Sequence, residues 1–226
     1  MLYKNIIFIH IPKTGGNSFQ KELILNKNYE GSITVAGNQD GFNTFGIKDK
    51  YTERKHQNLS IYNTKVDINS YNIVTIVREP TERLVSLYFS PHRMIKYKKG
   101  FSFLSKIMNL KSKLFFKITD DKFILEDFKR FISNVETQSS FLKIKDSIYN
   151  KITILKFENY NKECAKFFEK NNLKFQGIKI NGKIMKHDFA DLIKNNDLYK
   201  VINSTYHSED YRNFYQNKNL IWGKDI

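Results

Sequence analysis

The sequence predicts an α/β domain in which a central, mainly parallel β-sheet is flanked by helices. Three short runs rich in apolar and β-branched residues lie in the first half of 6–18, at 71–77 and at 152–157. A polar turn and a helical pattern follow each run. Such runs are typical of strands that are buried on both faces of a parallel sheet. In an open sheet of this kind, ligands bind where the strands end.

The first run leads into the segment Ile-Pro-Lys-Thr-Gly-Gly-Asn-Ser. Proline stops a strand because it lacks an N–H group, and the glycine pair allows a sharp turn. Asn17 or Ser18 is expected to cap the helix that follows. A strand, a glycine-rich turn and a helix N-terminus together form an anion site, because backbone N–H groups converge there. The expected contributors of N–H groups, hydroxyls and a cation are Lys13, Thr14, Gly15, Gly16, Asn17 and Ser18.

The second run, Tyr71–Val77, ends at Arg78, and a helix is expected from Pro80 or Thr81. Arg78 should therefore project from the carboxyl end of a strand. Its planar guanidinium can bind a phosphate through two parallel hydrogen bonds. Ser86 would lie about two helical turns after Pro80.

Both segments resemble motifs of sulfotransferases that use 3′-phosphoadenosine 5′-phosphosulfate (PAPS). Pro-Lys-Thr-Gly-Gly-Asn-Ser-Phe resembles the loop that holds the 5′-phosphosulfate, and Val-Arg-Glu-Pro-Thr-Glu-Arg-Leu-Val-Ser-Leu-Tyr resembles the 3′-phosphate motif. The resemblance implies that Arg78 and Ser86 hold the 3′-phosphate, and that Lys13 stabilises charge on the departing phosphate. It also implies a P-loop-like three-layer fold, with residues 1–226 forming a single sulfotransferase-like domain.

A third segment, Lys-His-Gln-Asn-Leu-Ser-Ile-Tyr, contains His56. It resembles a stretch of sulfotransferases related to the heparan sulfate 2-O-sulfotransferases, in which the histidine is the proposed general base. The resemblance thus makes His56 the second catalytic candidate beside Lys13. An imidazole with an ordinary pKa near ~6.5 is largely neutral at pH 7, as a base requires.

Further positions have weaker signals. The resemblance places Gln138 near the acceptor cleft and a basic loop with Lys183 and Lys186 over the nucleotide, while His92 and Arg93 could line the acceptor site. These five roles stay open. Glu158, at the end of the third run, is expected to cap a helix.

The composition of the chain limits the class of ligand and the cellular compartment that can be expected. The chain has 38 Lys and Arg against 23 Asp and Glu, and a net charge of +15 attracts nucleic acid, anionic membranes, nucleotides or acidic sugars. The positive charge is explained equally well by a lysine-rich surface that only increases solubility. A single cysteine, Cys164, and the lack of a signal peptide or long apolar run predict a cytoplasmic protein without a transmembrane segment. Association with a membrane surface stays open.

The predicted function is transfer of a sulfuryl group from PAPS to an acceptor hydroxyl, with a carbohydrate as the expected acceptor. No metal is expected, because no Cys/His cluster has metal-ligand spacing. Nucleic acid is not the expected partner. Two alternatives stay open: a kinase-like phosphoryl transferase, which would need the order Gly-Lys-Ser/Thr that is missing here, and a non-enzymatic binder of nucleic acid or anionic glycan. The identity of the acceptor and the oligomeric state cannot be inferred from these patterns.

Overall fold

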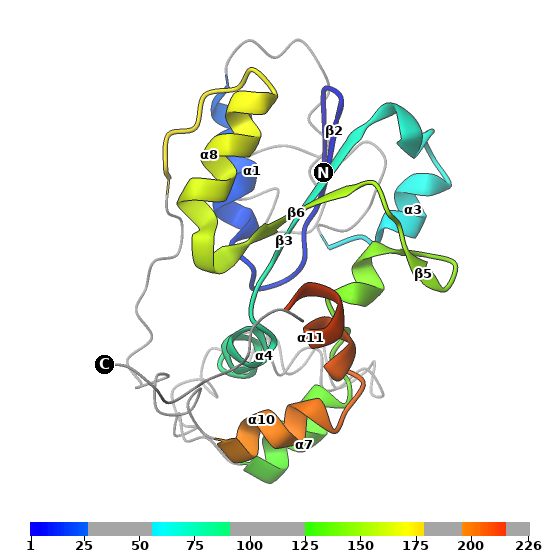
Figure 1. Cartoon of the computed structure of the whole chain (residues 1–226), viewed down its shortest axis with the longest axis vertical. Helices are drawn as coiled ribbons and strands as arrows, with labels where there is room; N and C mark the ends of the chain where they lie inside the picture. Colours follow the sequence, from blue (N-terminus) through cyan, green and yellow to red (C-terminus); the bar gives the residue numbers. More distant parts are fainter. Residues whose placement is uncertain (27–55, 91–124, 179–195, 216–226) are drawn as a thin grey trace, which may run out of the picture. The chain divides into compact units, whose positions relative to one another are not determined.

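The computed structural model (Figure 1) describes residues 1–26, 56–90, 125–178 and 196–215. Contacts group the chain into two compact units, each treated by itself below. The first comprises Met1–Glu79, Glu136–Lys186 and Glu209–Asn219, and the second comprises Pro80–Val135, His187–Ser208 and Leu220–Ile226. That residues 1–226 act as a single domain stays a prediction.

A four-stranded sheet with the order β1-β2-β3-β6 forms the centre of the first unit. β2 (Ile6–Ile9), β3 (Asn72–Val77) and β6 (Ile152–Lys156) are parallel neighbours, and β1 (Leu2–Tyr3) pairs antiparallel with β2. Because the strands run parallel, with Ile9 beside Thr75 and Val77 beside Lys156, their carboxyl ends lie at one edge of the sheet. The predicted α/β class with a mainly parallel sheet is confirmed. The antiparallel β1 was not predicted.

Helices lie on both sides of this sheet (Figure 1). α1 (Gly16–Leu25) and α8 (Tyr160–Lys170) pack together on one side, where the Phe19 ring centroid lies 5.7 Å from that of Phe167 and 5.2 Å from that of Phe168. Phe8 of β2 joins them, 4.5 Å from Phe19. Burying one such ring contributes about 1.5–3 kcal/mol. α3 (Leu59–Asn63) lies on the other side (Figure 1).

The remaining elements of the first unit are short. They are η1 (Ile68–Ser70), η2 (Ser139–Leu142), the hairpin of β4 (Lys143–Ile144) and β5 (Ser147–Ile148), η3 (Phe157–Asn159), and most of α11 (Ser208–Phe214). β6 departs from the expected fully buried strand, since Ile154 is 36% exposed and Leu155 is its single buried residue. Among the described strands, β6 is the last in the order β1-β2-β3-β6, and this position as an edge strand explains the exposure.

The second unit contains α4 (Pro80–Tyr88), α7 (Leu125–Ile132) and α10 (Asn196–Asn203). Tyr88 connects α4 with α7: its ring lies 5.4 Å from that of Phe128, and its hydroxyl donates to Asp127 Oδ2 at 2.8 Å. α4 begins at Pro80, as predicted, because proline needs no hydrogen-bond acceptor at the first position of a helix.

Candidate active site

The loop after β2 is held in an unusual backbone conformation. Lys13 has a φ of 68° and Gly15 a φ of 87°, both in the left-handed region. This conformation costs an ordinary residue such as lysine about 1–2 kcal/mol. The buried Thr14 hydroxyl donates to the Ile11 carbonyl at 2.9 Å, which closes the turn. The loop therefore presents its backbone, together with the Lys13 side chain, at the strand end.

α1 starts earlier than the sequence patterns predict. Its N-cap is Gly15, which makes no side-chain capping bond, so the expected cap by Asn17 or Ser18 was wrong. The Gly15 carbonyl instead accepts the N–H groups of Ser18 at 3.1 Å and Phe19 at 3.4 Å. The N–H groups of Gly16 and Asn17, ahead of Ser18, have no acceptor within the helix. Without a side-chain cap, this end of α1 suits an anion.

The two glycines are needed for different reasons. A Cβ on Gly16 would lie 2.2 Å from Cδ2 of His10, so the imidazole occupies the space that a side chain would take. A Cβ on Gly15 would lie 2.9 Å from the Phe157 ring, in addition to the strain of its positive φ. Both glycines thus allow aromatic rings to lie directly against the loop.

His56 contacts the same loop through its imidazole. Its Nδ1 lies 2.8 Å from the backbone carbonyl of His10, and the two rings lie 4.5 Å apart, edge to face. A carbonyl can only accept, so Nδ1 carries the proton and Nε2 is the basic nitrogen of neutral His56. This is the tautomer in which Nε2 can accept a proton from a substrate.

His10 was missed by the sequence reasoning. It is 4% exposed, and its Nδ1 lies 3.1 Å from Oε1 of Gln20 on α1. The sequence did contain a signal for His10. A histidine that directly follows an apolar strand is expected to be buried, and a buried imidazole needs a hydrogen-bond partner. His10 thereby connects α1, the loop and His56.

Arg78 directly follows β3, at the sheet edge where the loop after β2 also lies. Its guanidinium Cζ lies 4.6 Å from the ring centroid of Phe157, which follows β6. Because Phe157 also lies against Gly15, one ring contacts the segments that follow β2 and β3. The predicted position of Arg78 at a strand end is confirmed.

Lys13 and Arg78 form a pair of like charges. Burial first, and then the positive charge of Arg78, lowers the pKa of the Lys13 ammonium below its ordinary value. Opposite charge would raise it, and no carboxylate among the described residues contributes to the shift. Two half-buried cations that follow neighbouring parallel strands are suited to an anionic ligand.

Two other predicted residues lie beneath this site. Gln138 is fully buried, and its amide is bound to the backbone of Arg78, so it supports the site from behind. Glu158 does not cap α8, whose N-cap is Asn159. Its carboxylate accepts the Glu79 backbone N–H at 2.6 Å instead, because the sheet brings the ends of β3 and β6 together.

The remaining candidates lie in the second unit or outside the described residues. Ser86 is half-buried on α4, in the second unit, and its role stays a prediction. His92, Arg93, Lys183 and Lys186 lie outside the described residues.

Comparison with known proteins gives one match. A model described as the sulfotransferase family matches residues 3–149, more than half of the chain. The chain belongs to the sulfotransferase family. The matched region of this sulfotransferase includes the loop after β2, His56, Arg78 and Gln138, and it stops before β6. No curated protein and no solved structure matches the chain.

The described residues contain no group of three or more His, Cys, Asp or Glu side chains that could hold a metal ion. Within the same ranges, none of the helices has the length and apolar character needed to cross a membrane.

Proposed function

We propose that this sulfotransferase transfers the sulfuryl group of PAPS to a hydroxyl of a carbohydrate. The observation that supports this most is that the Lys13 loop and Arg78 follow neighbouring parallel strands, β2 and β3, at the same end of the sheet. PAPS has phosphate groups at both ends of its ribose, and it would need a separate cation for each. The uncapped start of α1 supplies N–H groups beside Lys13.

In the proposed nucleotide complex, Lys13 and the N–H groups of 15–17 hold the 5′-phosphosulfate, with the hydroxyls of Thr14 and Ser18 alongside. Arg78 holds the 3′-phosphate, and Ser86 assists it if α4 approaches as the sequence motif implies. Such a loop between a strand and a helix is P-loop-like in the general sense that backbone N–H groups surround a phosphate.

His56 would act as the general base in the transfer step. Its Nε2 accepts the proton of the acceptor hydroxyl while the hydroxyl oxygen bonds to sulfur. The bond between sulfur and the 5′-phosphate oxygen breaks, and adenosine 3′,5′-bisphosphate leaves with that electron pair. Lys13 stabilises the charge that grows on the departing oxygen. Removing one such stabilising group typically costs about 10²–10³ in rate.

A carbohydrate acceptor is supported by two features of the chain. The His56 segment resembles that of enzymes acting on sugar hydroxyls, and the net charge of +15 would attract an acidic saccharide. Family membership favours sulfuryl transfer over the phosphoryl transfer of a kinase.

Thermal shift measurements distinguish the two chemistries. Adenosine 3′,5′-bisphosphate without metal should raise the melting temperature, whereas ATP with magnesium should have little effect. Transfer from labelled PAPS to a panel of polysaccharides then tests activity. His56→Ala should abolish transfer but retain the thermal shift. Stabilisation by ATP with magnesium alone would contradict the proposal, and so would full activity of His56→Ala.

A further inference from the structure

The side-chain amide of Gln138 is joined to the peptide groups on both sides of Arg78 Cα. The Arg78 backbone N–H donates to Gln138 Oε1 at 2.8 Å, and Gln138 Nε2 donates to the Arg78 carbonyl at 2.8 Å. We call this pair of bonds the Gln138 bridge. The paired residues of β3 and β6 end at Val77 and Lys156, so at Arg78 a side-chain amide replaces a neighbouring strand. A carboxamide suits this role, because it is neutral and offers a donor and an acceptor on two adjacent atoms.

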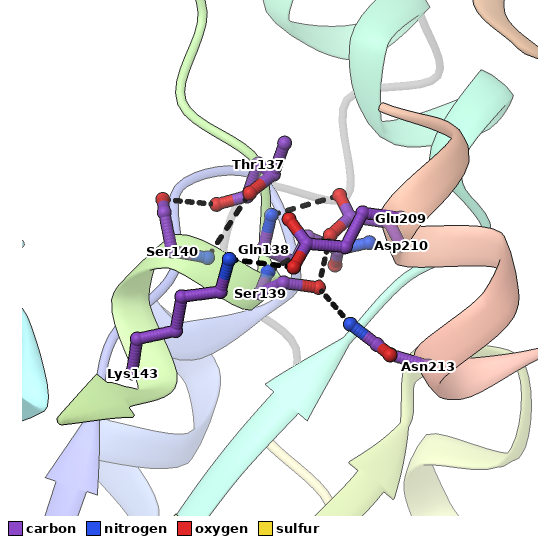
Figure 2. Close-up of polar contacts among 8 residues, drawn as sticks. All are labelled: Thr137, Gln138, Ser139, Ser140, Lys143, Glu209, Asp210 and Asn213. Atoms are coloured by element: carbon purple, nitrogen blue, oxygen red, sulfur yellow. Dashed lines mark hydrogen bonds and ion pairs between the residues drawn. The ribbon is translucent and has the colours of Figure 1, made fainter. Parts of the chain in front are cut away.

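Gln138 is itself held in place by a buried carboxylate. Asp210, which is 1% exposed, accepts the backbone N–H of Gln138 on Oδ2 and that of Ser139 on Oδ1, each at 2.8 Å. The Ser139 hydroxyl also donates to Asp210 Oδ1 at 2.8 Å and accepts from Asn213 at 2.9 Å. Figure 2 shows Asp210 reaching from α11 to the start of η2. Asp210 thus accepts three hydrogen bonds in a buried place, so this anchor is firm.

The bridge acts on the backbone of Arg78 and does not involve its guanidinium. Gln138 is fully buried, whereas the Arg78 side chain is half-buried and lies over Phe157. The peptide group that follows Arg78 Cα is held a second time, since Glu158 accepts its N–H, that of Glu79, at 2.6 Å. The backbone of Arg78 is therefore held by Gln138 and Glu158, two side chains from other segments of the first unit.

We propose that Gln138, anchored by Asp210, is a positioning residue for Arg78 and thereby determines recognition of the 3′-phosphate. This inference rests on the proposed function, because it assumes that Arg78 binds that phosphate. Without the bridge, the guanidinium would have to be ordered during binding, and the entropy of that ordering would weaken affinity.

The test compares the affinities of adenosine 3′,5′-bisphosphate and adenosine 5′-phosphate, which lacks the 3′-phosphate. Arg78→Ala should abolish the preference for the bisphosphate. Gln138→Leu should reduce that preference about tenfold, which corresponds to the loss of one or two hydrogen bonds. Its affinity for adenosine 5′-phosphate should not change. In the double variant, Gln138→Leu should add nothing to the effect of Arg78→Ala.

Asn26→Leu is the matched control, because the Asn26 amide makes the same pair of bonds to the Lys174 backbone, at 2.7 and 3.0 Å. Asn26→Leu should keep the wild-type preference for adenosine 3′,5′-bisphosphate over adenosine 5′-phosphate. If Gln138→Leu does not fold, Gln138→Glu replaces it, since a carboxylate retains the acceptor and loses the donor. A folded Gln138 variant with the wild-type preference would overturn the positioning role. A wild-type chain that binds neither nucleotide would overturn the proposed function, and the positioning role with it.

Discussion

Burial and the positive charge of Arg78 both disfavour the charged form of Lys13. Its folded-state pKa is lowered, so the charged lysine costs stability at neutral pH, and this cost disappears only above the ordinary value of 10.5. A left-handed backbone adds strain at the same residue. Strain and like charge concentrated on one residue are expected where a ligand supplies the compensation.

Lys13→Met should therefore separate stability from binding. Without nucleotide, the melting temperature at pH 7 should stay the same or rise, because a poorly solvated charge is removed. Affinity for adenosine 3′,5′-bisphosphate should fall about ten- to hundredfold, the loss expected for a charged hydrogen bond. Thermal shift and calorimetric titration measure the two effects.

Lys4→Met is the control for this prediction, since Lys4 also has a positive φ, of 49°. It should leave nucleotide affinity unchanged. A Lys13→Met protein that melts well below the wild type and binds nucleotide equally would show that Lys13 is a structural residue.

At the scale of elements, the strand-loop-helix unit of β2 and α1 depends on close packing at its turn. The His10 ring fills the space beside Gly16 and lies edge to face with His56. The loop, the helix start and the proposed base are thus packed against one another. A change at the turn should therefore affect both stability and catalysis.

Gly16→Ala tests this coupling. The added methyl would lie 2.2 Å from the His10 ring, so the ring or the helix start must move. We expect a loss of about 1–3 kcal/mol in the free energy of unfolding, typical of overpacking, and a transfer rate lowered because His56 shifts. Urea unfolding and initial rates measure these effects.

Gly177→Ala provides the comparison, because Gly177 has a φ of 74° but its nearest contact would be at 4.0 Å. Backbone strain should lower the free energy of unfolding of Gly177→Ala, and its transfer rate should stay that of the wild type. If Gly16→Ala unfolds and turns over like the wild type, the loop is not held by His10.

Sequence patterns predicted the strands and the loop well, because periodicity and Pro/Gly chemistry are local. β2, β3 and β6 lie where apolar runs occur, and Arg78 follows β3 directly. The predicted caps by Asn17, Ser18 and Glu158 failed, because tertiary contacts at the sheet edge decide where these side chains bind. Gly15 can take the left-handed conformation itself, and Glu158 finds the Glu79 N–H on a neighbouring strand end.

For the whole molecule, the dominant property is its charge of +15. If the acceptor is an acidic saccharide, kcat/KM should fall steeply with added salt, because screening weakens long-range attraction. A neutral saccharide acceptor should show little salt dependence. Initial rates between ~50 and ~500 mM NaCl measure the difference, with screening lengths from about 14 to 4 Å.

Equal salt dependence for the two acceptors would show that the charge does not recruit the substrate. Tight, steeply salt-dependent binding to DNA or RNA without turnover would instead favour the non-enzymatic alternative.

The sequence by itself determined the α/β class, the order of strand, loop and helix, and the cations at the ends of β2 and β3. These follow from local chemistry: apolar runs followed by polar turns, the missing N–H of proline and the conformational freedom of the glycine backbone. Only the tertiary structure decided that Lys13 and Arg78 interact, that the His10 carbonyl selects the tautomer of His56, and that Gln138 joins Asp210 to Arg78. These contacts join residues far apart in the chain, and such pairs become neighbours only when parallel strands align.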